Sequence, residues 1–173
     1  MIGLRTFAVA AALVLAGCDA GAPTGTSQVT GVAASDAQFV QQMVLNHREA
    51  VVLASAALDP TRAAPLPLQR LAQRIEFQDN LEIGQMSRWL RQWQVPSPVA
   101  SASPSRPESN QAWLAAMMNN RREALAAAAE LQRTSQNPQV LDLAAAIERR
   151  LRAELKALRS AAQVAATADS PGQ

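Results

Sequence analysis

The sequence of 173 residues has one cysteine, one histidine, one lysine and no tyrosine. A lone cysteine has no partner for a disulfide within the chain. A lone histidine leaves no recognisable Ser-His-Asp arrangement, and it cannot supply the paired Glu-x-x-His motifs of a di-metal centre in a helical bundle. A glycine-rich phosphate-binding motif is also missing. From these absences we expect a protein that is not an enzyme.

Charged residues are few and nearly balanced. Sixteen basic residues, fifteen of them arginine, stand against fourteen acidic ones, so the formal net charge is +2. The arginines are scattered along the chain and form no basic cluster. This pattern gives no support to nucleic-acid binding.

The N-terminal stretch "MIGLRTFAVAAALVLAGCDA" has one early positive charge followed by an apolar run. It predicts a signal peptide over residues 1–17, too short to be a spanning helix. Its end, Leu15 to Cys18, resembles the lipobox of bacterial lipoproteins. That resemblance implies cleavage before Cys18 and a lipid on its sulfur, and thus a membrane-anchored protein on the periplasmic or other extracytoplasmic face. Residues 18–34, rich in small residues, predict a flexible tether.

Alanine accounts for 37 of the 173 residues, which strongly favours helices. Apolar residues recur at spacings of three and four in four segments separated by proline-containing breaks. We expect helices over about 36–58, 67–93, 110–133 and 138–162. Ser35 or Asp36 is predicted to cap the first helix, and Asn137 to cap the fourth.

The two halves of the domain repeat each other. A shift of 74 residues places Phe39, Met43 and Glu49 on Trp113, Met117 and Glu123, and a shift of 72 aligns the second and fourth helices. Each hairpin alone would expose an apolar stripe, so the repeat predicts a four-helix bundle. Its expected parts are the bundle 35–165, with hairpins 35–93 and 110–162, the linker 94–109, and a disordered tail 166–173. The linker length permits both an up-down bundle and one with a long crossover.

One family resemblance covers residues 36–93 and, more weakly, 110–158. The stretch with Phe39, Met43, Asn46 and His47, followed by "LAQRIEFQDNLEIGQMSRWL", resembles the family catalogued as domain of unknown function 305. This resemblance implies a ferritin-like helical bundle in the cell envelope, without an established enzymatic activity. It also implies copper as a possible ligand, because some periplasmic members bind it.

The chain departs from the family pattern at the residues that matter for copper. The family typically carries two adjacent histidines, and this chain has Asn46 and His47. Leu53 stands where a methionine often follows, and Asn120 and Arg121 replace the pair in the second repeat. The resemblance therefore carries a copper site over to three residues only: His47, Met43 and Met86.

The register of the first hairpin gives a candidate metal site independently. With a turn centred near residue 62, His47 falls opposite Gln78 and within one helical turn of Asp79 and Glu82. Thioether and imidazole donors from Met43, His47 and Met86 suit Cu(I). The carboxylates of Asp79 and Glu82 would instead complete a harder site for Zn(II) or Cu(II).

A purely structural interpretation stands beside the metal site. Methionines at helical spacing commonly fill gaps in a core, and a buried His47 can bond to Gln78 or Glu82. In the second repeat the register places Arg121 opposite Arg150, and it predicts an Arg121–Glu154 ion pair in place of His47 and Glu82. The function is then either a lipoprotein with a weak or residual copper site, or a structural lipoprotein that binds an envelope protein partner.

Overall fold

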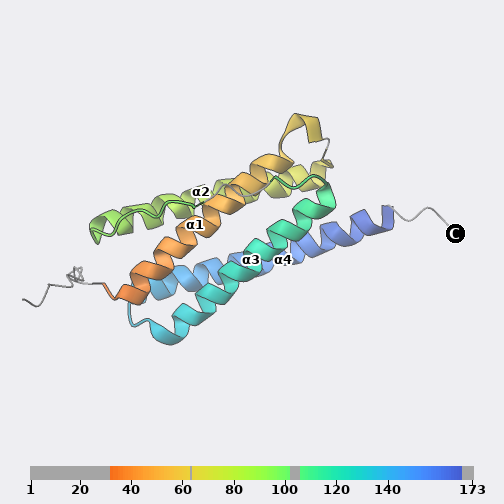
Figure 1. Ribbon diagram of the computed structural model, residues 1–173. Coiled ribbons are helices and arrows are strands. Elements are labelled where there is room, and N and C mark those ends of the chain that lie inside the picture. The colour runs from red at the N-terminus through yellow and green to blue at the C-terminus, as the bar shows by residue number, and fades with distance from the viewer. Residues whose placement is uncertain (1–31, 63, 102–105, 169–173) are drawn as a thin grey trace, which may run out of the picture.

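Four α-helices make up the part of the chain that the computed structural model describes, which is residues 32–62, 64–101 and 106–168. They form a bundle with no strand in those ranges, and this confirms the predicted all-α four-helix fold (Figure 1). In chain order the elements are α1 (Ala34–Ala57), the short 3-10 helix η1 (Pro60–Arg62), α2 (Leu66–Gln92), α3 (Asn110–Thr134) and α4 (Pro138–Ala168).

The predicted features of the N-terminal region lie outside the described residues. They are the signal peptide 1–17, the lipidated Cys18 and the tether as far as residue 31. Among the helices that are described, none is long and apolar enough to cross a membrane.

Polar caps begin two of the four helices. Ser109 Oγ accepts a hydrogen bond from the Ala112 backbone N–H at 3.0 Å, and Asn137 Oδ1 accepts from the Gln139 N–H at 3.0 Å, as predicted for α4. The predicted cap of α1 was wrong. That helix begins after Ala33 without a side-chain cap, and Asp36 lies inside its first turn, where a carboxylate favours the positive helix end.

Two helix ends differ from the simplest expectation. Helix α4 continues to Ala168, six residues beyond its predicted end, because alanines with high helix propensity fill its last turns. Residues 166–168 of the predicted disordered tail are therefore helical, and the rest of that tail lies outside the described residues. Helix α2 ends at Gln92, and two residues later Gln94 is left-handed, with φ of 57°. The Val95 N–H then reaches back to the Leu90 carbonyl at 2.8 Å and closes the helix end.

The linker after α2 makes a long crossover. Arg62 Nη2 donates to the Ser109 carbonyl at 2.7 Å, so α3 starts beside the end of α1, where α2 also starts. Helices α2 and α3 therefore run in the same direction, and the chain must return along the bundle between them (Figure 1). Hydrogen bonds fix this return path to α1, from Gln41 to the Pro96 carbonyl at 2.8 Å and from Arg48 to the Pro98 carbonyl at 2.6 Å.

Helices α1 and α3 pack antiparallel and join the two hairpins. At their centre Asn46 Nδ2 donates to the Asn120 carbonyl at 3.1 Å, and Asn120 Nδ2 donates to the Asn46 carbonyl at 3.0 Å. These two asparagines are 74 residues apart, the period of the sequence repeat. The reciprocal bonds thus place equivalent residues of the two repeats around a local two-fold axis.

The apolar core consists of two clusters along the bundle. The first includes Met43, Met86 and Ile147, and the second includes Ile75 and Trp113. Trp113 is fully buried, and its indole N–H donates to the Leu53 carbonyl at 2.6 Å. A group of buried polar side chains includes His47, Asp79 and Arg121, which are members of neither cluster.

Candidate metal centre

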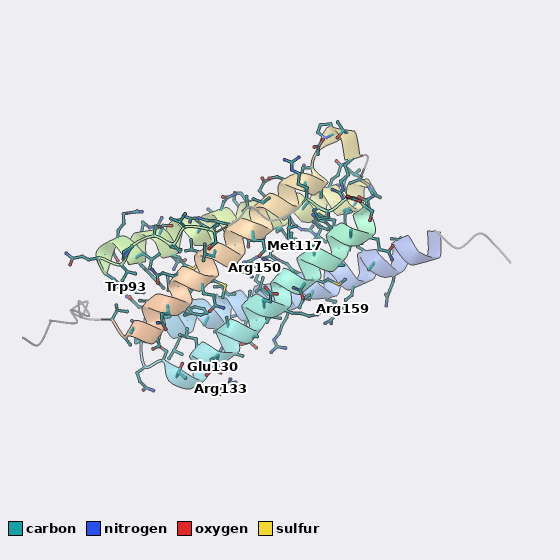
Figure 2. All side chains as sticks on the ribbon, viewed as in Figure 1. Trp93, Met117, Glu130, Arg133, Arg150 and Arg159 are labelled. Carbon is teal, nitrogen blue, oxygen red and sulfur yellow. The ribbon has the colours of Figure 1, made fainter. Side chains whose placement is uncertain are left out.

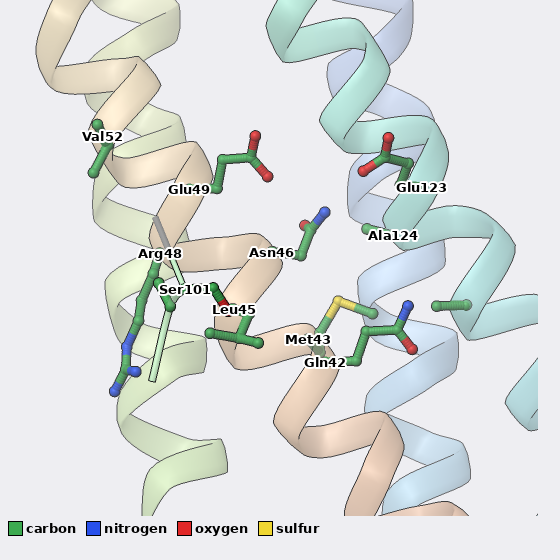
Figure 3. A pocket seen from close by; sticks show the side chains of 12 residues that line it. Gln42, Met43, Leu45, Asn46, Arg48, Glu49, Val52, Ser101, Glu123 and Ala124 are labelled. Atoms are coloured by element: carbon green, nitrogen blue, oxygen red, sulfur yellow. The ribbon is translucent and has the colours of Figure 1, made fainter. Parts of the chain in front are cut away.

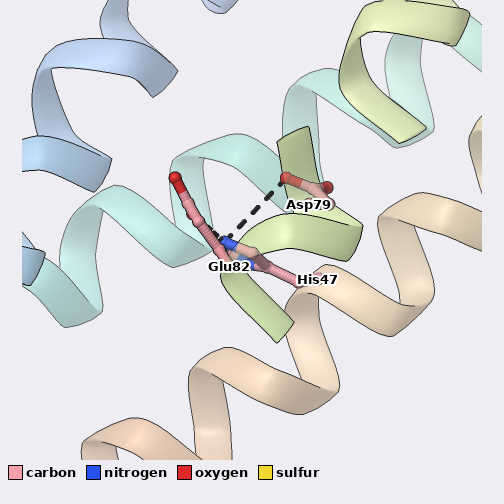
Figure 4. A group of neighbouring side chains, drawn as sticks. All are labelled: His47, Asp79 and Glu82. Carbon is pink, nitrogen blue, oxygen red and sulfur yellow. Dashed lines mark hydrogen bonds and ion pairs between the residues drawn. The ribbon is translucent and has the colours of Figure 1, made fainter. Parts of the chain in front are cut away.

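The single histidine lies in the interior of the bundle, where α1 faces α2. His47 is fully buried, and its Nε2 lies 2.6 Å from Glu82 Oε2 and 3.9 Å from Asp79 Oδ1 (Figure 4). The register argument placed Asp79 and Glu82 within one turn of this histidine, and the structure confirms both. Gln78, the alternative partner, is exposed.

Two arginines from the second hairpin enter the same site. Arg121 Nη2 on α3 lies 2.8 Å from Asp79 Oδ2, and Arg150 Nη2 on α4 lies 2.9 Å from Asp79 Oδ1. Arg150 also holds Glu82 with two nitrogens, Nε to Oε1 at 2.9 Å and Nη2 to Oε2 at 2.7 Å. Such two-point contacts between guanidinium and carboxylate are strong and fix the orientation of both groups.

Glu154 completes the group. Arg121 Nε lies 3.0 Å from Glu154 Oε2, which confirms the predicted ion pair, and Arg150 Nη1 donates to Glu154 Oε1 at 2.6 Å. We call the six side chains together the buried ion network: His47, Asp79, Glu82, Arg121, Arg150 and Glu154. Its three carboxylates and two guanidiniums leave one net negative charge when the imidazole is neutral.

The contacts within the network hold its charged forms. Burial raises the pKa of the Glu82 carboxyl, but hydrogen bonds from His47 and Arg150 outweigh it and lower that pKa to about 2. Burial acts to lower the pKa of Arg150, whereas its bond to Glu82 and the charges of Glu154 and Asp79 raise it above the ordinary value. Both groups are therefore charged throughout the physiological range.

The hydrogen bond to Glu82 determines which nitrogen of His47 is available to a ligand. Arg150 Nη2, which only donates, lies 3.2 Å from Nε2, but the carboxylate, which only accepts, is closer at 2.6 Å and favours the proton on Nε2. In the neutral imidazole the lone pair is then on Nδ1. That nitrogen is buried and has no hydrogen-bond partner among the described residues. A histidine that donates one N–H to a carboxylate and keeps the other nitrogen free is the usual form of a histidine metal ligand.

The predicted ligand residues fall into two groups. Ligand atoms of His47, Asp79 and Glu82 lie within 4.8 Å of one another, which is close enough for one metal ion. Met43 and Met86 are fully buried and belong to the first apolar cluster. Met43 lies one helical turn before His47, on the same face of α1.

The arginines were the part of the site that sequence reasoning missed. Arg121 was predicted to pair with Glu154, but its bond to Asp79 and all of the contacts of Arg150 with the first hairpin were not foreseen. A signal was present, because the register placed Arg150 opposite Arg121. Two like charges facing each other inside a bundle require acceptors from another helix.

A cleft of about 790 Å³ opens beside this region, between α1, α3 and the crossover. Figure 3 shows Glu49 of α1 and Glu123 of α3 on opposite sides of it, with Met43 and Asn46 between them. Of the two methionines predicted as ligands, Met43 lines this cleft. Other lining residues are Gln42, Leu45, Arg48, Val52, Ala100, Ser101, Ala124 and Ala127.

The family model described as domain of unknown function (DUF305) matches residues 36–112. Residues 36–112 are thus similar to the DUF305 family. The match spans the first hairpin, the crossover and the start of α3. It contains His47, Asp79 and Glu82, and the two arginines of the network lie beyond it.

Solved structures with the same fold include copper and silver complexes. CopM in the Cu(I)-bound form has a TM-score of 0.66 and 25% identity, over 74% of this chain and 95% of that one. CopM in the apo form has a TM-score of 0.64 and 26% identity, over 74% of this chain and 96% of that one. A DUF305 fragment from Deinococcus radiodurans has a TM-score of 0.64 and 22% identity, over 76% of this chain and 97% of that one. This similarity shows a common fold. No curated protein matches the chain.

Proposed function

We propose that this chain is a non-enzymatic lipoprotein of the cell envelope that binds a copper ion at His47. The observation that carries the proposal is the buried imidazole, which donates through Nε2 to Glu82 and has no partner at Nδ1. Further support comes from the likeness to CopM, whose solved forms include Cu(I)-bound and Cu(II)-bound ones. The expected lipid on Cys18 would keep the protein at the membrane, in the periplasm or on another extracytoplasmic face.

The donors present fit Cu(I) better than a harder ion. Cu(I) accepts imidazole and thioether donors, and His47 Nδ1 and the sulfur of Met43 would hold it. Met86, which is also fully buried, is a further thioether donor on α2. The network's single net negative charge matches a monovalent cation. The chemistry that copper would supply is only its own capture and release, since no reacting group accompanies the site.

Direct coordination by Asp79 and Glu82 is the less favourable arrangement. Zn(II) or Cu(II) on these carboxylates would have to displace Arg150, whose Nη2 lies 2.9 Å from Asp79 Oδ1 and 2.7 Å from Glu82 Oε2. We therefore assign both carboxylates a supporting role. Glu82 orients the imidazole through its Nε2–H, and Asp79 holds the two arginines in place.

The test is an anaerobic titration with Cu(I) against a competing chelator, and a parallel titration with Zn(II). Soluble protein of residues 19–173 contains every described contact. We expect one Cu(I) per chain, at least tenfold weaker binding in Met43→Leu, and loss of binding in His47→Ala. Met118→Leu on α3 is the matched methionine control and should bind as the parent does. Circular dichroism shows whether each variant is folded.

A second candidate function rests on the arginines. Arg121 and Arg150 already satisfy the three carboxylates, as in a site that has exchanged a metal for internal ion pairs. The chain would then be a structural lipoprotein or one that binds an envelope protein. Equal Cu(I) titration curves for the parent and a folded His47→Ala variant would refute the copper proposal and leave this alternative.

A further inference from the structure

The outer face of α2 carries a stripe of exposed apolar and basic side chains. Leu66, Phe77 and Leu81 are 56%, 61% and 55% exposed, and they account for half of the large hydrophobic residues on the described surface. Their spacing places them on one side of the helix, opposite the buried side that includes Leu71, Ile75 and Met86. Three exposed arginines share this side. The outer α2 stripe is therefore Leu66, Arg70, Arg74, Phe77, Leu81 and Arg88.

The charges of this stripe are uncompensated. Within the described ranges, Arg70, Arg74 and Arg88 form no ion pair, whereas five arginines of the crossover and the second hairpin do: Arg106, Arg121, Arg133, Arg150 and Arg152. The acidic residues of α2 face elsewhere. Asp79 and Glu82 belong to the buried ion network, and Glu76 accepts a hydrogen bond from Ser55 on α1 at 3.0 Å. The face thus presents positive charge and apolar surface without any carboxylate.

We propose that the outer α2 stripe docks on an anionic phospholipid bilayer. Guanidinium groups pair with lipid phosphates, while leucine and phenylalanine side chains enter the boundary between headgroups and acyl chains. A second copy of this chain fits less well, because a symmetric contact through the stripe would bring the same arginines against each other. A membrane supplies both negative charge for the arginines of the stripe and an apolar layer for its leucine and phenylalanine side chains.

The predicted anchor brings the same surface within reach. The 15 residues between Cys18 and Ala34 can extend over roughly 50 Å, and α2, with 27 residues, is roughly 40 Å long. A lipidated chain could therefore lay α2 flat on the bilayer that holds it. The docking surface itself does not depend on the lipid, so it can be tested on protein that has none.

The experiment is co-sedimentation of residues 19–173 with vesicles of phosphatidylcholine, with and without phosphatidylglycerol. This protein retains all of α1 to α4 and both apolar clusters. We expect binding to the phosphatidylglycerol vesicles that weakens with added salt, because exposed charges are screened. The triple variant Arg70→Gln, Arg74→Gln, Arg88→Gln should bind roughly a hundredfold more weakly, at about tenfold or less per arginine. The double variant Phe77→Ser, Leu81→Ser should also lose binding.

Matched controls separate this stripe from general surface charge. Arg122→Gln, Arg149→Gln, Arg159→Gln removes three exposed arginines from α3 and α4, and Val99→Ser removes an exposed apolar residue that is 86% accessible. Both should bind vesicles as the parent does. Equal losses in the control triple would overturn the proposal. So would no vesicle binding at all, and a parent dimer that the Phe77→Ser, Leu81→Ser variant abolishes would then assign the stripe to a second copy.

Discussion

Arg150 on α4 holds Glu82 on α2 with two of its nitrogens, at 2.9 and 2.7 Å. These helices otherwise have few contacts, because α1 and α3 provide most of the packing between the hairpins. The guanidinium of Arg150, which is labelled in Figure 2, thus ties α4 to α2 through the interior of the bundle.

Removing the charge of Asp79 should destabilise the fold strongly. Asp79 is fully buried and faces both Arg121 and Arg150, so Asp79→Asn leaves two buried guanidiniums short of an acceptor. We expect the free energy of unfolding to fall by about 3–5 kcal/mol in urea denaturation. Glu130→Gln removes an exposed carboxylate and should change it by less than about 0.5 kcal/mol. A loss below about 1 kcal/mol for Asp79→Asn would show that water enters the network.

Acid should weaken the bundle through Glu82. Its pKa is about 2 in the folded protein and 4.5 as an ordinary carboxyl, so the depressed value stabilises the folded state above pH 4.5. This contribution, about 3 kcal/mol, is lost as the pH falls from 4.5 toward 2. Urea unfolding across this range measures it. The folded Glu82→Gln variant should show a shallower decline than the parent, and parallel curves would contradict the assignment.

Gln94 offers a site for stabilisation. Its φ of 57° is a left-handed conformation that costs a residue with a Cβ about 1 kcal/mol, and glycine adopts it freely. We expect Gln94→Gly to raise the free energy of unfolding by roughly 0.5–1 kcal/mol. Gln92→Gly, two residues earlier and still helical, should lower it instead. If both variants are destabilised, the helix end does not keep this conformation in solution.

Gly84, in the middle of α2, offers a second site at which a substitution should stabilise the fold. A Cβ there would have Arg88 Nη1 as its nearest neighbour at 3.7 Å, an ordinary contact with a flexible side chain. Gly84→Ala should therefore raise the free energy of unfolding by about 0.5–1 kcal/mol through helix propensity alone. Gly84→Ser, with a poorer helix former, should gain less. Thermal unfolding followed by circular dichroism gives the order of the three proteins.

The sequence alone was enough to predict the fold and the first hairpin's part of the site. Apolar periodicity and proline breaks located all four helices, and the repeat indicated their pairing. Because an antiparallel hairpin with a known turn fixes which residues face each other, Asp79 and Glu82 could be placed beside His47. The Arg121–Glu154 pair followed from the same argument applied to the second hairpin.

What could not be predicted depends on how the hairpins dock. The contacts of Arg150 with Glu82 and Asp79 join residues about 70 positions apart. The apolar pattern within one hairpin does not determine how the two hairpins are rotated and shifted relative to each other. The crossover was left open for the same reason, since a 16-residue linker spans the bundle in either topology. The missed cap of α1 has a local cause. The helix begins two residues earlier than expected, so Asp36 lies within its first turn, where its negative charge interacts favourably with the helix dipole.

The buried ion network divides its charge unequally between the two halves of the chain. The carboxylates of Asp79 and Glu82 give the first hairpin two negative charges, whereas Arg121, Arg150 and Glu154 give the second hairpin one net positive charge. If the chain were cut in the crossover, each fragment would expose a patch that only the other could neutralise. The complementary charges of the network thus favour docking of the two hairpins on each other through these faces.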